Sequence, residues 1–172
     1  MQTLEQHLKQ RHVQLERYSG IMIFDDVVIF PLWNLSGQYI GYQQYRPGDT
    51  KGCRNDPRDG RYYTSLHGDK NEKPLAVWGL ETYHYDDRYL VVVEGVFDAV
   101  RLHNHGVPCV AVLSSSTKHL RNWLSSLVKK IYKVEDGHGS KLGPYQNLEL
   151  PFGRKDLGEC SEDQVKEVLE TL

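Results

Sequence analysis

The sequence has few cysteines and no long apolar run. Its 172 residues include three widely separated cysteines, Cys53, Cys109 and Cys160. Without a Cys-x-x-Cys pair the chain contains no zinc ribbon, and the odd number indicates a reducing compartment rather than a disulfide framework. No stretch approaches the roughly 18 apolar residues of a membrane span, and the first residues lack the apolar core of a secretory signal. We therefore expect a cytoplasmic protein with no membrane partner.

An excess of charge of either sign is also missing. The chain has 21 lysines and arginines against 23 aspartates and glutamates, a formal net charge of −2. This balance argues against a strong general nucleic-acid binder but allows a local basic patch. Charged residues make up 26% and hydrophobic residues 39% of the chain, which is typical of a globular protein with one domain or two small lobes.

The pattern of apolar and polar residues changes along the chain and divides it into two parts, residues 1–86 and residues 87–172. The first part begins with helical spacing over residues 3–17 and continues with short apolar runs that predict an antiparallel meander over residues 21–46. The second part alternates strands and helices, which predicts a mainly parallel sheet with right-handed crossovers. Its expected elements are strand 88–94, helix 96–105, strand 108–113, helix 117–128 (capped by Ser114–Thr117), strand 130–135 and helix 162–171.

Acidic residues follow two strands of this predicted sheet. The apolar run that precedes Glu94-Gly95 leads into a helix with Asp98 in its first turn, and a later strand ends at Glu135-Asp136. Each pattern alone is more typical of a solvated strand end or a favourable first-turn acid than of a functional site. If neighbouring strands bring these carboxylates together, a divalent cation must neutralise their repulsion. The pattern thus favours Mg²⁺ or Mn²⁺ and phosphoryl-transfer chemistry.

A mixed-charge segment, residues 153–159, precedes the last helix. It places Lys155 where it can meet a phosphate and Asp156 where it can approach a metal. The alternative interpretation is an ordinary solvated loop.

These motifs resemble the two signatures of the Toprim domain, which bacterial and phage primases, topoisomerases and some nucleases share. The first is Glu94-Gly95 with Asp98, and the second is the run Asp136-Gly137-His138-Gly139. Residues 28–42 and 61–65 are similar to the small lobe that precedes the Toprim lobe in primases, and the resemblance covers roughly residues 20 to 160. It implies an α/β protein with an α+β N-terminal lobe of antiparallel strands, followed by a Rossmann-like Toprim lobe with a mainly parallel sheet.

The resemblance also implies a function, the synthesis of RNA primers on single-stranded DNA by metal-dependent nucleotidyl transfer in a bacterial or phage-infected cell. Its catalytic residues would be Glu94, Asp98 and Asp136. The Mg²⁺ or Mn²⁺ ligands would be Glu94, Asp136, His138 and Asp156. Template or nucleotide phosphates would meet Arg46, Arg61, Lys73 and Lys155. Nearby tyrosines, including Tyr45 and Tyr62, would either stack on bases or pack between the lobes.

The chain departs from the family pattern at His138, where the second signature has a second aspartate. Imidazole suits softer metals than Mg²⁺, so this residue is either no ligand, a sign of Mn²⁺ preference, or a cause of weak binding. The zinc ribbon that reads the template in primases and a helicase part are both absent, so a replication partner, a helicase or a zinc-ribbon subunit, would have to supply these functions from another chain. Two alternatives stay open, a catalytically decayed Toprim module that binds nucleic acid or a replication partner, and a Toprim nuclease.

Overall fold

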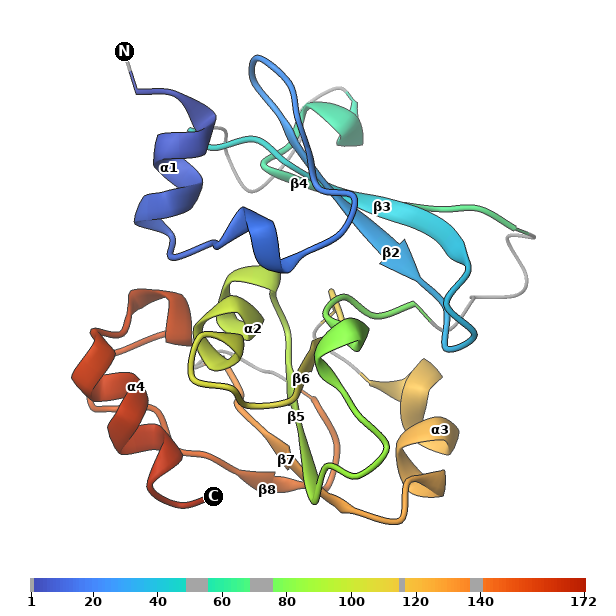
Figure 1. The fold of residues 1–172 in the computed structure, drawn as a ribbon, viewed down its shortest axis with the longest axis vertical. Helices are drawn as coiled ribbons and strands as arrows, with labels where there is room; N and C mark the ends of the chain where they lie inside the picture. The colour runs from blue at the N-terminus through green and yellow to red at the C-terminus, as the bar shows by residue number, and fades with distance from the viewer. Residues whose placement is uncertain (1, 49–55, 69–75, 115–116, 137–140) are drawn as a thin grey trace. The chain divides into compact units, whose positions relative to one another are not determined.

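The computed structural model describes residues 2–48, 56–68, 76–114, 117–136 and 141–172. The chain forms two compact units, residues 1–78 and 79–172 (Figure 1). The first unit combines a helix with an antiparallel sheet, and the second combines helices with a parallel sheet. This arrangement confirms the fold class expected from the sequence. No helix within the described ranges is long and apolar enough to cross a membrane.

Four strands in the order β1-β2-β3-β4 form the sheet of the first unit. In chain order its elements are α1 (Leu4–Gln10), the 3-10 turn η1 (Leu15–Arg17), β1 (Met22–Ile23), β2 (Val28–Trp33), β3 (Tyr39–Tyr45), the 3-10 turn η2 (Pro57–Asp59) and β4 (Tyr62–Leu66). Apolar side chains of β2, including Phe30, are buried, and the ring of Trp78 packs edge-on against Phe30 at 5.8 Å between centroids. The core of this unit therefore lies against β2, as its near-continuous apolar sequence predicts.

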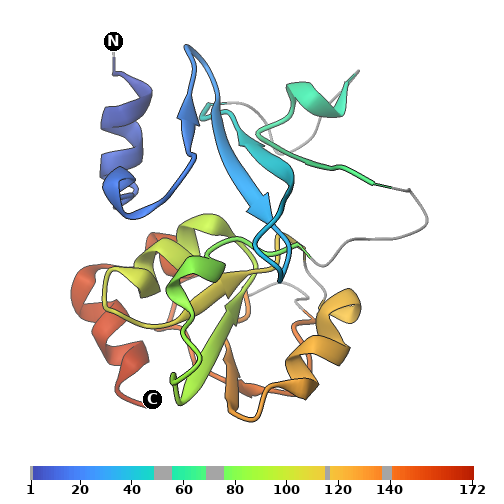
Figure 2. The same ribbon diagram turned by 45° about the vertical axis from the view of Figure 1, so that its right-hand side comes forward.

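The second unit contains a four-stranded sheet in the order β6-β5-β7-β8, and every pair in it is parallel. Helices α2 and α4 lie on one side of this sheet and α3 on the other (Figures 1 and 2). The elements are the 3-10 turn η3 (Leu80–Thr82), β5 (Tyr89–Val93), α2 (Val96–His103), β6 (Cys109–Ala111), the 3-10 turn η4 (Lys118–Leu120), α3 (Arg121–Ser126), β7 (Lys130–Lys133), β8 (Gln146–Asn147), the 3-10 turn η5 (Leu157–Glu159) and α4 (Glu162–Leu169).

The boundary between the units lies between residues 78 and 79. The sequence pattern had predicted it between residues 86 and 87. Residues 79–82 lie with the second unit because of Thr82. Its hydroxyl donates to the carbonyl oxygen of Gly79 at 2.8 Å and also lies 3.2 Å from that of Cys109, in β6. The segment before β5 is thereby tied to the parallel sheet.

Two helices are shorter than the sequence pattern predicts. The helical spacing over residues 3–17 is interrupted after α1, because His12 adopts a positive φ of 63° that no α-helix contains. In place of a helix over residues 117–128, η4 leads into α3, and neither has a side-chain cap. Thr117, which was predicted to belong to a cap, instead donates its buried hydroxyl to the carbonyl oxygen of Leu142 at 3.1 Å. That prediction is wrong for Thr117, and Ser115 and Ser116 lie outside the described residues.

Candidate active site

The turn between β5 and α2 carries the first acidic motif. β5 is buried, Glu94 is half-buried at its end, and Gly95 is the N-cap of α2. A Cβ atom at Gly95 would lie only 2.9 Å from Oδ2 of Asp98. A larger residue at this position would therefore displace the Asp98 carboxylate from its place against the turn.

Asp98 connects this turn to the mixed-charge segment before α4. Its side chain is 7% exposed, and its Oδ1 accepts a hydrogen bond from the backbone N–H of Gly158, in η5, at 3.1 Å. In the same segment, Asp156 caps η5 by accepting from the N–H of Glu159 at 3.0 Å, and Lys155 is exposed. The structure thus fastens the loop that contains Lys155 to the helix that begins at the first acidic turn.

The second acidic motif follows β7, the neighbour of β5. Val92 pairs with Lys133 in the parallel register, and the N–H of Val134 continues the pairing by donating to the carbonyl oxygen of Val92 at 3.1 Å. Glu94 and Glu135 each follow two residues beyond the last of these pairs, and Asp136 is next in the chain. The acidic ends of the two strands therefore lie at the same edge of the sheet, and this predicted adjacency of the strands is confirmed.

Glu135 and Asp136 have different surroundings. Glu135 accepts a hydrogen bond from the Lys133 ammonium at 2.7 Å, and its backbone N–H donates to the Asn147 side chain at 3.2 Å. Asp136 is half-buried at the end of the described segment. Asn147 lies in β8, so this short strand helps to hold the backbone of the acidic end. No sequence pattern marks Asn147, which is why reasoning from the sequence missed it.

The oxygen donors at this edge fit Mg²⁺ or Mn²⁺. Such ions are commonly held by one or two carboxylates, with water and substrate phosphates as the other ligands, and Glu94 and Asp136 supply two carboxylates at neighbouring strand ends. Within the described ranges no group of three His, Cys, Asp or Glu side chains is arranged to hold a metal ion with protein ligands alone. His138 lies outside those ranges.

The first unit contains the remaining predicted phosphate contacts, apart from Lys73, which lies outside the described residues. The Arg46 guanidinium donates to Asp26 at 3.0 Å and to the carbonyl oxygen of Arg58 at 2.6 Å. Part of its hydrogen-bonding capacity is therefore used within the protein. Arg61 is half-buried, and its carbonyl oxygen accepts from the N–H of Arg46. The backbones of the two arginines therefore pair just beyond the strands, where Arg46 follows the end of β3 and Arg61 precedes the start of β4.

An aromatic stack lies beside these arginines. Tyr45 is buried, and its ring stacks on those of His7 and Tyr62, at 5.8 and 5.1 Å between centroids. Burial raises the pKa of Tyr45, and burial together with the Arg11 charge lowers the pKa of His7. Tyr45 thus packs within the first unit, whereas Tyr62 remains 41% exposed.

Comparisons with known proteins give a consistent picture of the fold. No protein-family model matches the chain. A DNA primase of Aquifex aeolicus (strain VF5) is 30% identical over 114 residues, which is 64% of this chain but only 22% of the length of that relative.

Solved primase structures match nearly the whole chain. A structure of the DnaG catalytic core has a TM-score of 0.66 and 20% identity, covering 98% of this chain and 70% of that one. A structure of the DnaG primase catalytic domain bound to ssDNA has a TM-score of 0.60 and 21% identity, covering 97% of this chain and 57% of that one. At such identities the likeness concerns the fold. The chain therefore has the fold of a DNA primase catalytic core.

Proposed function

We propose that this chain is a primase-type nucleotidyltransferase that makes RNA primers on single-stranded DNA. The observation that carries the proposal is the pairing of β5 with β7, which brings the acidic ends of both strands to one edge of a sheet in a primase-core fold. Open α/β sheets bind their ligands at the carboxyl ends of the strands. The relation to a DNA primase supports the same conclusion.

In this proposal Glu94 and Asp136 hold Mg²⁺ or Mn²⁺, with His138 and Asp156 as further candidate ligands. The cation, when bound, neutralises negative charge on the reacting phosphates. Asp98 keeps the η5 segment against α2, and Lys155, which precedes this segment, is proposed to meet a phosphate as a point charge.

We also propose that the first unit binds phosphates of template or nucleotides through Arg46, Arg61 and Lys73. The exposed ring of Tyr62 beside Arg61 suits stacking on a base of single-stranded DNA. One structural relative is described as bound to ssDNA, which supports this choice of ligand. The proposed replication partner is a helicase or a zinc-ribbon protein, and the zinc ribbon would read the template.

Primer synthesis from labelled ribonucleotides on single-stranded DNA, with Mg²⁺ or Mn²⁺, tests the proposal. Glu94→Gln should lower the rate by about 100-fold or more, because proton handling and metal binding at that carboxylate are lost. The unfolding midpoint should not change, since Glu94 is only half-buried. Glu167→Gln, an exposed glutamate on α4, is the matched control and should retain full activity.

A second function, binding without catalysis, is favoured by one observation. Oδ1 of Asp98 and Oε1 of Glu135 already accept hydrogen bonds within the protein, so fewer carboxylate oxygens are available to a metal than the sequence suggests. The same assay separates the two functions when binding of single-stranded DNA is measured alongside. If the chain binds single-stranded DNA but makes no primer with any metal ion or added helicase, the enzyme hypothesis is rejected and the binding module remains.

A further inference from the structure

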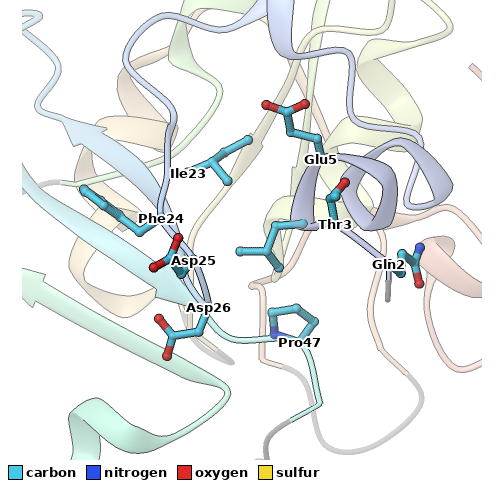
Figure 3. A pocket seen from close by; sticks show the side chains of 9 residues that line it. Gln2, Thr3, Glu5, Ile23, Phe24, Asp25, Asp26 and Pro47 are labelled. Atoms are coloured by element: carbon cyan, nitrogen blue, oxygen red, sulfur yellow. The ribbon is translucent and has the colours of Figure 1, made fainter.

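A groove of about 1080 Å³ lies in the first unit, between the first turn of α1 and the hairpin that joins β1 to β2. Figure 3 shows Thr3 and Glu5 on one wall and Phe24, Asp25 and Asp26 on the other. Pockets for drug-sized ligands span about 300–1,000 Å³, so this groove has room for several residues of an extended peptide.

One wall of the groove includes Ile23, the last residue of β1, which is an edge strand of the antiparallel sheet. β1 is the outermost strand, and its Met22 and Ile23 pair with Ile29 and Val28 of β2. On the opposite edge of β1 no strand from the described part of the chain pairs with it. An open edge presents backbone N–H and C=O groups in the spacing of a strand, which is a template for an added strand.

The side chains around this edge are apolar and acidic. Phe24 is 54% exposed and Met22 is 46% exposed, which is unusual for side chains of this size so close together. Glu5 and Asp25 are exposed, and neither forms an ion pair with another described residue, whereas Asp26 is paired with Arg46 at 3.0 Å. Two unpaired carboxylates repel the phosphates of nucleic acid and attract lysine or arginine.

We propose that this groove binds an extended, basic segment of a partner protein, which joins the sheet as a strand beside β1. Alternating side chains of such a strand point to opposite faces, so its lysines or arginines can meet Glu5 and Asp25 while its apolar residues cover the exposed Phe24. The groove is built only from residues of the first unit. Glu5 and Asp25 have no part in the proposed nucleotidyl transfer, so the variant that replaces both should leave primer synthesis by the chain alone unchanged.

Fluorescence anisotropy of the full chain with a labelled, acetylated heptapeptide of alternating lysine and valine tests this inference. The wild-type chain should bind the peptide, with an affinity that falls as salt is added. The double variant Glu5→Gln, Asp25→Asn should bind at least about tenfold more weakly, since two ion pairs of roughly 0.7 kcal/mol each are lost. Asp163→Asn, a highly exposed aspartate on α4, is the matched control and should bind like the wild type.

A peptide of the same sequence with alternate backbone nitrogens methylated separates strand addition from simple charge attraction. It keeps every charge but cannot pair with β1, and it should bind much more weakly. No binding of the parent peptide, equal binding of the methylated one, or equal binding by the double variant would each overturn the proposal.

Weaker binding of single-stranded DNA by the double variant would identify the occupant as nucleic acid. A dimer in sedimentation that the double variant abolishes would identify it as a second copy of the chain. Either result would overturn the proposal as well.

Discussion

Asp98 combines a structural contact with a place beside the candidate site. Its carboxylate accepts a hydrogen bond from the N–H of Gly158 and lies against the Gly95 turn. The resemblance to the first Toprim signature implies a catalytic role for this residue. The contact with Gly158 adds a positioning role, because it fastens the segment with Lys155 to α2.

Two substitutions at Asp98 separate these roles. Asp98→Ala leaves the Gly158 N–H without its acceptor and should lower the free energy of unfolding by about 1–3 kcal/mol. Asp98→Asn retains an oxygen acceptor and should keep most of the stability. Urea unfolding of both variants measures the difference, and primer synthesis by Asp98→Asn shows whether the negative charge itself is needed. An alanine variant as stable as the wild type would refute the positioning role.

At the scale of elements, α4 is attached to α2 through one buried guanidinium. Arg101 is 1% exposed and donates to Glu162 at 2.5 Å and to the carbonyl oxygen of Cys160 at 2.8 Å. His105 lies 3.0 Å from the other oxygen of Glu162. Desolvation alone would raise the pKa of Glu162, but hydrogen bonds and charges from Arg101 and His105 together hold it below its ordinary value. The ionised form is thus the one that binds α2.

This depressed pKa predicts acid sensitivity of the second unit. The stabilisation from Glu162 should be fully present above its ordinary pKa and lost as pH falls through the lower pKa of the folded state. At pH 7, Glu162→Gln should be less stable than the wild type by about 1 kcal/mol, a value limited by the half-exposed carboxylate. Thermal unfolding between pH 7 and pH 3 should show the two proteins converging in acid. Glu167→Gln should follow the wild type throughout, and a Glu162→Gln deficit that persists unchanged at pH 3 would contradict the account.

Across the whole molecule, local patterns predicted most of the fold. The apolar runs before Glu94 and Glu135 identified β5 and β7, and the alternation of strands and helices implied their parallel pairing. β8 was not foreseen, since a strand of two residues has no periodicity and depends on its partner β7. The same limit applies to the candidate site. Its acids could be predicted from strand ends, but the contacts of Asp98 with Gly158 and of Glu135 with Asn147 join segments far apart in the chain.

The central claim is that the acidic ends of β5 and β7 hold a divalent cation for nucleotidyl transfer. Calorimetric titration of the full chain with Mn²⁺ tests it most directly. The wild type should bind the ion, and Asp136→Asn and Glu94→Gln should each weaken binding by at least about tenfold, while the control Asp163→Asn binds like the wild type. Equal binding of Mn²⁺ by all four proteins, or no binding by the wild type, would contradict the claim.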